Sequence, residues 1–397
     1  MRNGWAETTL GDIAEVLDRM RKPISASERE KRMGDVPYYG ATGQAGWIDK
    51  PIFDEELVLL GEDAIDFLNP DVHKAYLISG PSWVNNHAHV LRAKREKVLS
   101  FFLMEALNAV DYSQFVAFGT RSKLTQGSMM GISVQVPPLE EQKRIVDVVS
   151  SVDVYIDALQ QQVDSARTAR NAVLHELLSS GGDDWTETTL GELLSRSIGG
   201  VWGGEPGSDQ EEVTVVRSTE FTRSGVLNYS TGVFRSIRSG QLSTRELAAG
   251  DILLEKSGGG PEQPVGRVVY VESDIPPRFV CSNFIQLLTP IVEKVLPRFL
   301  FLQMWMWHFE NRTLEFQAQT TGIRNLRTPD YLEQSVALPP VSVQKRIVEI
   351  VSSMDDVIQS TEQAVVDAKN LRSGLLSDLL SGVHEIPASY DVFVGAA

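Results

Sequence analysis

One sequence frame occurs twice in this chain. The sequence WAETTLGD at 5–12 recurs as WTETTLGE at 185–192, an offset of 180 positions. A second block at 137–146, in which Pro-Pro is followed by QKRIV, recurs at 339–348, an offset of 202. Such repetition indicates one structural unit used twice. The two enclosed segments differ in length by 22 residues, the difference between the offsets, and share little sequence. The frame is therefore repeated while its contents vary.

Each copy of the second block opens a long helical pattern. Small or apolar residues recur at alternating spacings of three and four over about four heptads, as in a coiled-coil seam. The predicted seam residues are Val149, Val152, Ile156, Leu159 and Val163 in the first copy and Val351, Met354, Ile358, Val365 and Leu375 in the second. Because the two seams share length and register, we expect the helices to pair with each other. The alternative is two amphipathic helices that pack separately on their own domains.

Chain connectivity predicts the direction of this pairing. A helix of about 38 residues spans roughly 57 Å, whereas a globular segment of about 154 residues has a radius of gyration near 15 Å. The second segment is too small to carry the chain back, so the second helix is expected to return antiparallel. Arg170 and Arg372 occupy matching seam positions. Their stems are expected to pack while the heads reach water, or else to pair with a carboxylate.

The whole pattern predicts an α+β protein, in which two domains of mixed α/β structure are separated by two long antiparallel coiled-coil helices with a pseudo-two-fold internal repeat. The expected segments are 1–136 (first domain), 137–182 (first spacer helix), 183–338 (second domain), 339–382 (second spacer helix) and 383–397 (a tail that packs near the first domain).

Composition limits the functions that remain. With Cys281 as its one cysteine, the chain has no internal disulfide and no cysteine metal cluster. It lacks an apolar run of about 18 residues and an N-terminal h-region, so a cytoplasmic protein is expected. The net charge is −16, whereas proteins that hold DNA unaided carry a basic footprint. Any DNA contact is therefore expected from local basic patches together with a partner.

The order of these motifs resembles the specificity subunits of type I restriction-modification systems across nearly the whole chain. The repeated Trp-to-Gly opening, the variable segment, the Pro-Pro and QKRIV block and the long helix all match that family's plan. Within the variable segments, the stretches at 38–41, 59–63 and 85–91 resemble one kind of target-recognition domain. Those at 250–260 and 320–326 resemble another, with 119–124 as the first-half counterpart of the last.

The resemblance implies a division of labour. Each variable domain would read one half of a split double-stranded DNA site, while two methyltransferase subunits and the restriction-translocase subunits dock on the chain. S-adenosylmethionine, ATP and Mg²⁺ are expected in those partners, so no cofactor, metal or catalytic residue is expected in this chain. Half-sites roughly one and a half to two DNA turns apart would suit helices of this length.

Candidate DNA contacts are polar or basic residues beside glycines and turns, where backbone N–H groups can also meet phosphate. Carboxamides can pair with adenine N6 and N7 together. Structural hydrogen bonding and ordinary solvated surface charge are the competing explanations, and a metal role for the histidines would need a third ligand. The candidates are Asn85, Asn86, His87, His89, Arg92, Arg121 and Lys123 in the first half, and Lys256, Ser257, Gly258, Arg324 and Arg327 in the second.

Other glycine-rich stretches imitate cofactor motifs incompletely. Gly40, Gly43 and Gly46 do not have the spacing of a dinucleotide fold, and the glycines at 258–260 lack the Lys-Ser/Thr of a P-loop. A stand-alone methylase or nuclease therefore has no complete motif behind it. An acidic scaffold or DNA mimic with coiled-coil helices remains the alternative function, which the charge permits.

Overall fold

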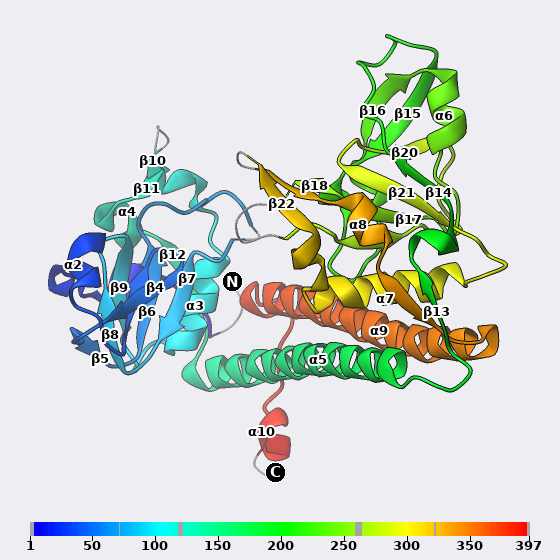
Figure 1. The fold of residues 1–397 in the computed structure, drawn as a ribbon. Coiled ribbons are helices and arrows are strands. Elements are labelled where there is room, and N and C mark those ends of the chain that lie inside the picture. The colour runs from blue at the N-terminus through cyan, green and yellow to red at the C-terminus, as the bar shows by residue number, and fades with distance from the viewer. Residues whose placement is uncertain (1–3, 71, 118–121, 259–263, 321–322, 395–397) are drawn as a thin grey trace. The chain divides into compact units, whose positions relative to one another are not determined.

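The computed structural model describes residues 4–70, 72–117, 122–258, 264–320 and 323–394 (Figure 1). It divides into two compact units, one made of residues 1–160 with 363–397 and the other of residues 161–362. Each unit holds one globular domain of strands and helices, together with part of each of two long helices. The predicted α+β class is confirmed.

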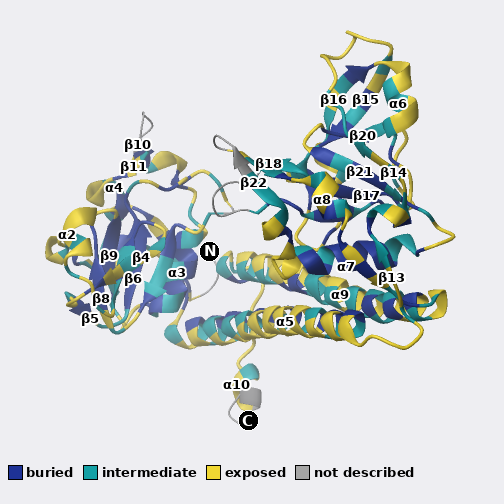
Figure 2. Ribbon diagram, viewed as in Figure 1, coloured by how far each residue is buried: buried dark blue, intermediate teal, exposed yellow. Residues whose placement is uncertain are grey.

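The long helices are α5 (Leu139–Ser179) and α9 (Val341–Leu380), of 41 and 40 residues. They lie within the predicted spacers at 137–182 and 339–382. None of the ten predicted seam side chains is exposed, and Val149, Ile156, Val163, Val351 and Val365 are buried. Exposed residues lie elsewhere on both helices, mixed with further buried residues toward the helix ends (Figure 2). Burial therefore follows the seam read from the sequence.

Within each unit the helices run antiparallel. In the first unit, Ile145 and Val149 of α5 share a core with Leu375 and Leu379 of α9, and Asp153 pairs with Arg372. In the second unit the same arrangement joins α5 residues 174 and 178 to α9 residues 347 and 351. Residue numbers thus increase along α5 as those of the contacting residues of α9 decrease, as in an antiparallel pair.

The two seam arginines make different contacts. Arg372 donates to Asp153 and also, at 2.6 Å, to Glu105 of the first globular domain. Arg170 donates to Asp355 at 2.9 Å, and its guanidinium carbon lies 4.6 Å from the ring centre of Trp305 in the second domain. Each arginine therefore ties the helix pair to the globular domain of its own unit, and both pair with a carboxylate.

The first globular domain is built around two four-stranded sheets, ordered β2-β9-β6-β7 and β4-β3-β8-β5, with small two-stranded sheets β1-β12 and β10-β11. Its strands are β1 (Ala6–Thr9), β2 (Ala14–Val16), β3 (Val36–Gly40), β4 (Gly43–Ile48), β5 (Phe53–Asp54), β6 (Leu57–Gly61), β7 (Ala75–Ile78), β8 (Pro81–Val84), β9 (Ala88–Ala93), β10 (Val116–Ala117), β11 (Lys123–Leu124) and β12 (Ser133–Val136). Its α-helices are α1 (Leu10–Ile13), α2 (Ala26–Glu30), α3 (Ser100–Asn108) and α4 (Gln126–Met130), with 3-10 turns η1 (Asp18–Met20) and η2 (Tyr112–Gln114).

The second globular domain contains sheets ordered β14-β21-β17-β19, β16-β15-β20 and β18-β23-β22, with the pair β13-β24. Its strands are β13 (Thr186–Thr189), β14 (Leu194–Gly199), β15 (Glu211–Val216), β16 (Val233–Ile237), β17 (Ile252–Glu255), β18 (Ser257–Gly258), β19 (Val268–Tyr270), β20 (Phe279–Cys281), β21 (Ile285–Pro290), β22 (Gln317–Thr320), β23 (Ile323–Leu326) and β24 (Ser335–Leu338). Its helices are α6 (Ser239–Arg245), α7 (Pro297–Phe309) and α8 (Thr328–Leu332), with 3-10 turns η3 (Gly191–Leu193), η4 (Ser218–Glu220), η5 (Tyr229–Thr231) and η6 (Arg312–Phe316).

The two domains share one topology in spite of their unlike sequences. The antiparallel sheet β2-β9-β6-β7 corresponds strand for strand to β14-β21-β17-β19. In the second sheet, β3 pairs antiparallel with β4 and parallel with β8, as β15 does with β16 and β20. The central strands β6 and β17 are buried at every position. Apolar side chains of different kinds can fill such positions, so the sequence can change while the pairing persists.

The repeated frame residues perform the same tasks in both halves. Gln142 accepts a hydrogen bond from the backbone N–H of Leu99 and donates to the carbonyl of Pro137, both at 2.8 Å. Gln344 does the same with Leu296 and Pro339, also at 2.8 Å. Both glutamines are buried. A buried carboxamide must be satisfied, which explains why this residue recurs in each QKRIV block.

The remaining frame residues close the base of each domain. Strand β1 pairs with β12, and β13 pairs with β24 in the same register. Lys97 donates to the carbonyl of Asp12, and Lys294 donates to that of Glu192, at 3.0 and 2.9 Å. The strand pairs join the opening of each frame to the segment before its long helix, and the lysines join it to the segment before α3 or α7.

The tail lies in the first unit. Ile386 packs against the core of that unit, and Arg144 of α5 pairs with Asp391 of α10 (Tyr390–Val394) at 2.8 Å. Among the described residues, no helix combines the length and apolar character needed to cross a membrane.

Candidate nucleic-acid interface

A short hairpin is attached at the same place in both domains. In the first domain, β10-β11 follows α3, and the backbone N–H of Leu124 donates to the carbonyl of Glu62 at 2.9 Å. In the second, β22-β23 follows α7, and Leu326 donates to the carbonyl of Lys256 at 2.8 Å. Glu62 and Lys256 each follow the last residue of a central strand, β6 or β17. The hairpins are therefore equivalent features of the shared topology.

The turn that precedes β9 or β21 completes this region. The N–H of Glu62 donates to the carbonyl of His87 at 2.8 Å, and the N–H of Lys256 donates to that of Phe284 at 2.9 Å. Strand end, turn and hairpin thus meet in each domain. These segments contain most of the DNA contacts predicted from the sequence.

In the first domain this region is held by an ion-pair network. Arg21 donates to Glu62 at 2.6 Å and lies 3.2 Å from Asp18. Lys123, on the hairpin, pairs with the other oxygen of Glu62 at 2.8 Å. Burial by itself raises the pKa of Glu62, but the hydrogen bonds from Lys123 and Arg21 outweigh it, so the pKa is lowered. The charged carboxylate therefore anchors the hairpin to the sheet.

His89 links the same network to the hairpin backbone. Its Nδ1 lies 2.6 Å from Asp18, and its Nε2 lies 2.9 Å from the carbonyl of Leu124. Asp18, Glu62 and His89 bring three potential metal ligands close together. Because Arg21 already neutralises both carboxylates and both ring nitrogens of His89 have partners, we assign this cluster to holding the hairpin.

The equivalent region of the second domain carries different chemistry. Lys256 replaces Glu62, and its ammonium donates to the carboxamide oxygen of Gln286 at 3.2 Å. Ser257 donates to Asn325 of the hairpin at 2.7 Å. Gly258 adopts a φ of 129°, a conformation that other residues rarely adopt. Neutral hydrogen bonds and a lysine thus occupy the place of the first domain's ion pairs.

The predicted candidates divide by exposure. Asn86, His87 and Lys123 are exposed in the first domain, and His87 lies 2.5 Å from Asp63. Lys256, Ser257, Gly258 and Arg324 are half-buried around the hairpin of the second domain. Arg121 lies outside the described residues.

The structure corrects two of the predicted contacts and finds two more in ion pairs. Asn85 and His89 are buried, and the Asn85 carboxamide accepts from the N–H of His87, so both serve the fold. Arg92 pairs with Glu15 and Glu55 on another part of the sheet. Arg327 is exposed but pairs with Asp330 at the start of α8. Neighbouring glycines suggested phosphate contacts, whereas the tertiary structure supplies carboxylates from distant strands.

Several residues of the region escaped sequence analysis. Asp18 and Arg21 lie on and beside a 3-10 turn, and they meet a histidine 71 positions away from Asp18. No local pattern signals that meeting. Gln286 and Asn325 stand where His89 and Lys123 stand in the first domain, and only the shared strand pairing identifies them.

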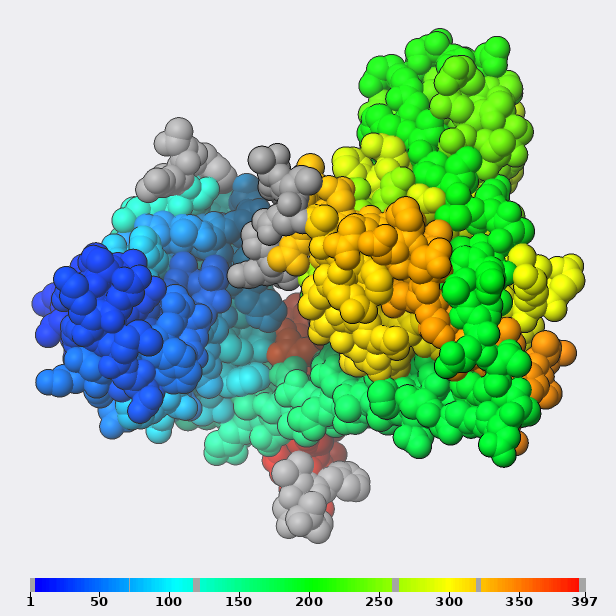
Figure 3. Space-filling view, viewed as in Figure 1, coloured from blue at the N-terminus to red at the C-terminus, as the bar shows by residue number. Residues whose placement is uncertain are grey.

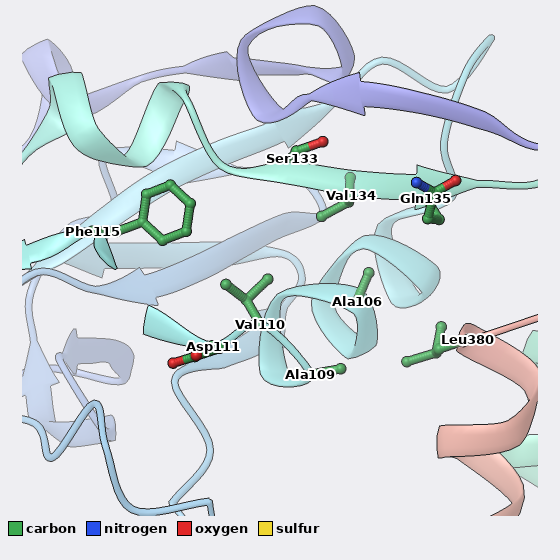
Figure 4. Close-up of a pocket in the computed structure, with 9 residues that line it drawn as sticks. All are labelled: Ala106, Ala109, Val110, Asp111, Phe115, Ser133, Val134, Gln135 and Leu380. Carbon is green, nitrogen blue, oxygen red and sulfur yellow. The ribbon is translucent and has the colours of Figure 1, made fainter. Parts of the chain in front are cut away.

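A pocket of about 290 Å³ lies in the first unit, between α3, β12 and the end of α9 (Figure 4). Ala106, Val110, Phe115 and Val134 form its apolar walls. Asp111 is the one ionisable residue among those that line it, and its carboxylate accepts from the N–H of Ser113 at 2.9 Å. With one ionisable residue, the lining offers no pair of groups for acid-base catalysis.

Fold and site together define a protein of two topologically equal domains on a duplicated frame, whose hairpin regions differ in charge. The chain belongs to the type I restriction modification DNA specificity domain family, whose model matches residues 2–165 and 183–367. It is thus a DNA sequence-recognition subunit of a type I restriction-modification system, as the sequence resemblance predicted.

Individual relatives agree with this assignment. A putative type I restriction enzyme specificity subunit from Haemophilus influenzae is 23% identical over 366 residues, which cover 90% of this chain and 89% of that protein. The S subunit of a type I restriction-modification system from M. genitalium has a similar fold, with a TM-score of 0.53, 15% identity and coverage of 96% and 97%. A chain from a structure concerned with assembly and conformational transition of the type I R-M system gives a TM-score of 0.58, 15% identity and coverage of 96% and 98%.

Proposed function

We propose that this chain reads a split DNA site, one half with each globular domain, and docks two methyltransferase subunits and the motor-nuclease subunits on its frame. The observation that carries the proposal is the contrast between the two hairpin regions. Their backbone connections are equal, but Glu62, which pairs with Arg21 and Lys123, stands where Lys256 stands in the other domain. Equal scaffolds with unlike polar groups suit the reading of unlike sequences.

The DNA contacts proposed for the first domain are Asn86, His87 and Lys123, which are exposed at the turn and hairpin. Those proposed for the second domain are Lys256, Ser257, Gly258 and Arg324. A backbone that approaches closely at Gly258 can donate to phosphate, while serine and carboxamide groups reach base edges.

The same proposal assigns the chemistry to the partners. The net charge of −16 makes this chain a poor holder of phosphate by itself, so the methyltransferase subunits would supply much of the backbone contact. They would also carry S-adenosylmethionine, and the motor-nuclease subunits would carry ATP and Mg²⁺. The chain itself contributes recognition and no catalytic step.

A domain exchange tests the proposal. Residues 12–136 are replaced by the corresponding segment of a family member that recognises a different half-site, and DNA methylation is mapped after assembly with the methyltransferase subunit. Only one half of the methylated site is expected to change. A parallel exchange of the second domain serves as the control and should change only the other half. Changes in both halves from one exchange, or equal specific methylation without any partner, would contradict the proposal.

A further inference from the structure

Two exposed aromatic side chains stand on edge strands of the two domains. Trp47 lies on β4 and Phe234 on β16, and each strand is the outermost member of its sheet. In the second unit, β15, β16 and α6 gather in a lobe at the surface (Figure 3). The two residues are 49% and 71% exposed.

Strand pairing shows that the two positions are equivalent. Tyr39 of β3 pairs with Val84 of β8, and Val216 of β15 pairs with Cys281 of β20, both in parallel pairs. Val84 and Cys281 each lie four residues before the start of the following strand, β9 or β21. The N–H groups of the following residues donate to Tyr39 and Val216 in the same way. Two positions earlier, Pro37 pairs with Trp47 and Thr214 pairs with Phe234.

Both aromatic rings lie on the outer face of their sheet. The residues next to their cross-strand partners, Tyr38 and Val215, are buried. Side chains alternate between the faces of a strand, so Trp47 and Phe234 point away from that core. Isolated exposed apolar residues need no explanation by themselves. An exposed aromatic residue at the same position of two divergent domains does need an explanation.

A feature that both domains share is expected to meet a partner that both domains share. Groups that read different half-sites differ, as Glu62 and Lys256 do. A shared aromatic therefore points to an identical partner met by each half, or to the DNA backbone. Cations supply most of the affinity for a DNA backbone, but Arg235 beside Phe234 pairs with Glu205 and lies over Trp202. Arg29, next to Gly46 on β4, lies over Tyr38.

We propose that Trp47 and Phe234 are equivalent anchors, each docking one copy of the same protein partner through an apolar pocket on that partner. Buried aromatic anchors dominate many protein interfaces. The proposal rests on the proposed function, under which the partner present in two copies is the methyltransferase subunit. It adds a docking contact on the globular domains to those on the frame.

The test measures binding of purified methyltransferase subunit to the full chain, without DNA, by titration calorimetry and native mass spectrometry. The variants are Trp47→Ala, Phe234→Ala and their combination. Conservative variants Trp47→Phe and Phe234→Trp test for rescue. Controls at other exposed apolar residues are Leu68→Ala in the first unit and Val292→Ala in the second, which are 55% and 64% exposed. Urea unfolding checks that each variant folds.

We expect each alanine variant to weaken one of two binding sites by about ten- to hundredfold, and the combination to weaken both, while the conservative and control variants bind like the parent chain. If affinity is unchanged in all variants, the anchor proposal is overturned while the proposed function stands. Unchanged subunit affinity with reduced DNA binding by the assembled complex also overturns them and makes the rings DNA contacts. Failure of the parent chain to bind the methyltransferase overturns the proposed function as well.

Discussion

The two seam arginines provide a matched pair in which equal substitutions should have unequal effects. Arg372 faces the carboxylate of Glu105, whose side chain is 3% exposed, and that of Asp153, which is 36% exposed. Among the described residues, Arg170 pairs with one carboxylate, that of Asp355, which is 34% exposed. The hydrogen bonds that Arg372 donates to Asp153 and Glu105 raise the pKa of its guanidinium, so its cation is retained.

Replacing Arg372 by methionine leaves the Glu105 charge buried without its partner. Removing one member of a buried ion pair costs about 3–5 kcal/mol, and we expect the first unit to lose that much stability. In Arg170→Met, water can solvate Asp355. The buried Nη1 of Arg170 also has no hydrogen-bond partner among the described residues, so the substitution removes an unsatisfied donor. We expect a cost of about 1–2 kcal/mol in the second unit, close to that of losing charged hydrogen bonds at a half-exposed site.

Native-state hydrogen exchange, resolved by peptide, is the suitable assay because the two units can open with different free energies. Exchange in 363–380 reports on Arg372→Met, and exchange in 341–362 reports on Arg170→Met. Adding Glu105→Gln to Arg372→Met removes the stranded charge and should restore about half of the loss or more. The reasoning is refuted if Arg170→Met costs as much as Arg372→Met, or if Glu105→Gln restores nothing.

Three further predictions follow from the site and the helices. The pKa of Glu62 is lowered from its ordinary value of 4.5, so the stabilisation by its charged form is present above pH 4.5 and is lost as pH falls through the lowered pKa. The difference in unfolding free energy between the parent chain and Glu62→Gln, measured by urea unfolding, should therefore shrink from pH 7 to pH 4. A constant difference would exclude the ion-pair network as its cause. Lys256→Gln should weaken DNA binding by the assembled complex and reduce the slope of log binding constant against log salt concentration by about one. The control Lys369→Gln, at an exposed position of α9, should leave affinity and slope unchanged. Equal effects of the two variants would argue against a specific contact at Lys256. Inserting seven residues after position 160 and seven after position 362 lengthens each helix by about 10.5 Å. Methylation mapping should then find a spacer about three base pairs longer, with both half-sites unchanged. A three-residue insertion breaks the seam and should abolish methylation.

The outcome for the candidate site was mixed for a physical reason. The chain has 53 acidic and 37 basic side chains, and many of the described lysines and arginines pair with a carboxylate. Arg92 and Arg327 do so, although their sequence neighbours suggested phosphate contacts. The buried roles of Asn85 and His89 depend on groups that are distant in sequence, such as Asp18 and the carbonyl of Leu124.

Duplication, helix length and seam register could all be read from the sequence, because they are local and periodic properties. A repeat with alternating spacings of three and four specifies a buried stripe wherever the helix lies, and the ten predicted seam residues are accordingly shielded. Short connections then leave an antiparallel return as the reasonable path.

The equivalence of the two globular domains was decided only by tertiary structure. Sheet neighbours such as Thr214 and Phe234 are set by strand pairing, which leaves little trace in sequence when each domain fills its core differently. The opposite charges of Glu62 and Lys256 at one position, and the shared exposure of Trp47 and Phe234, become visible once the strands are paired. Local patterns encode elements, whereas long-range pairing determines which side chains meet.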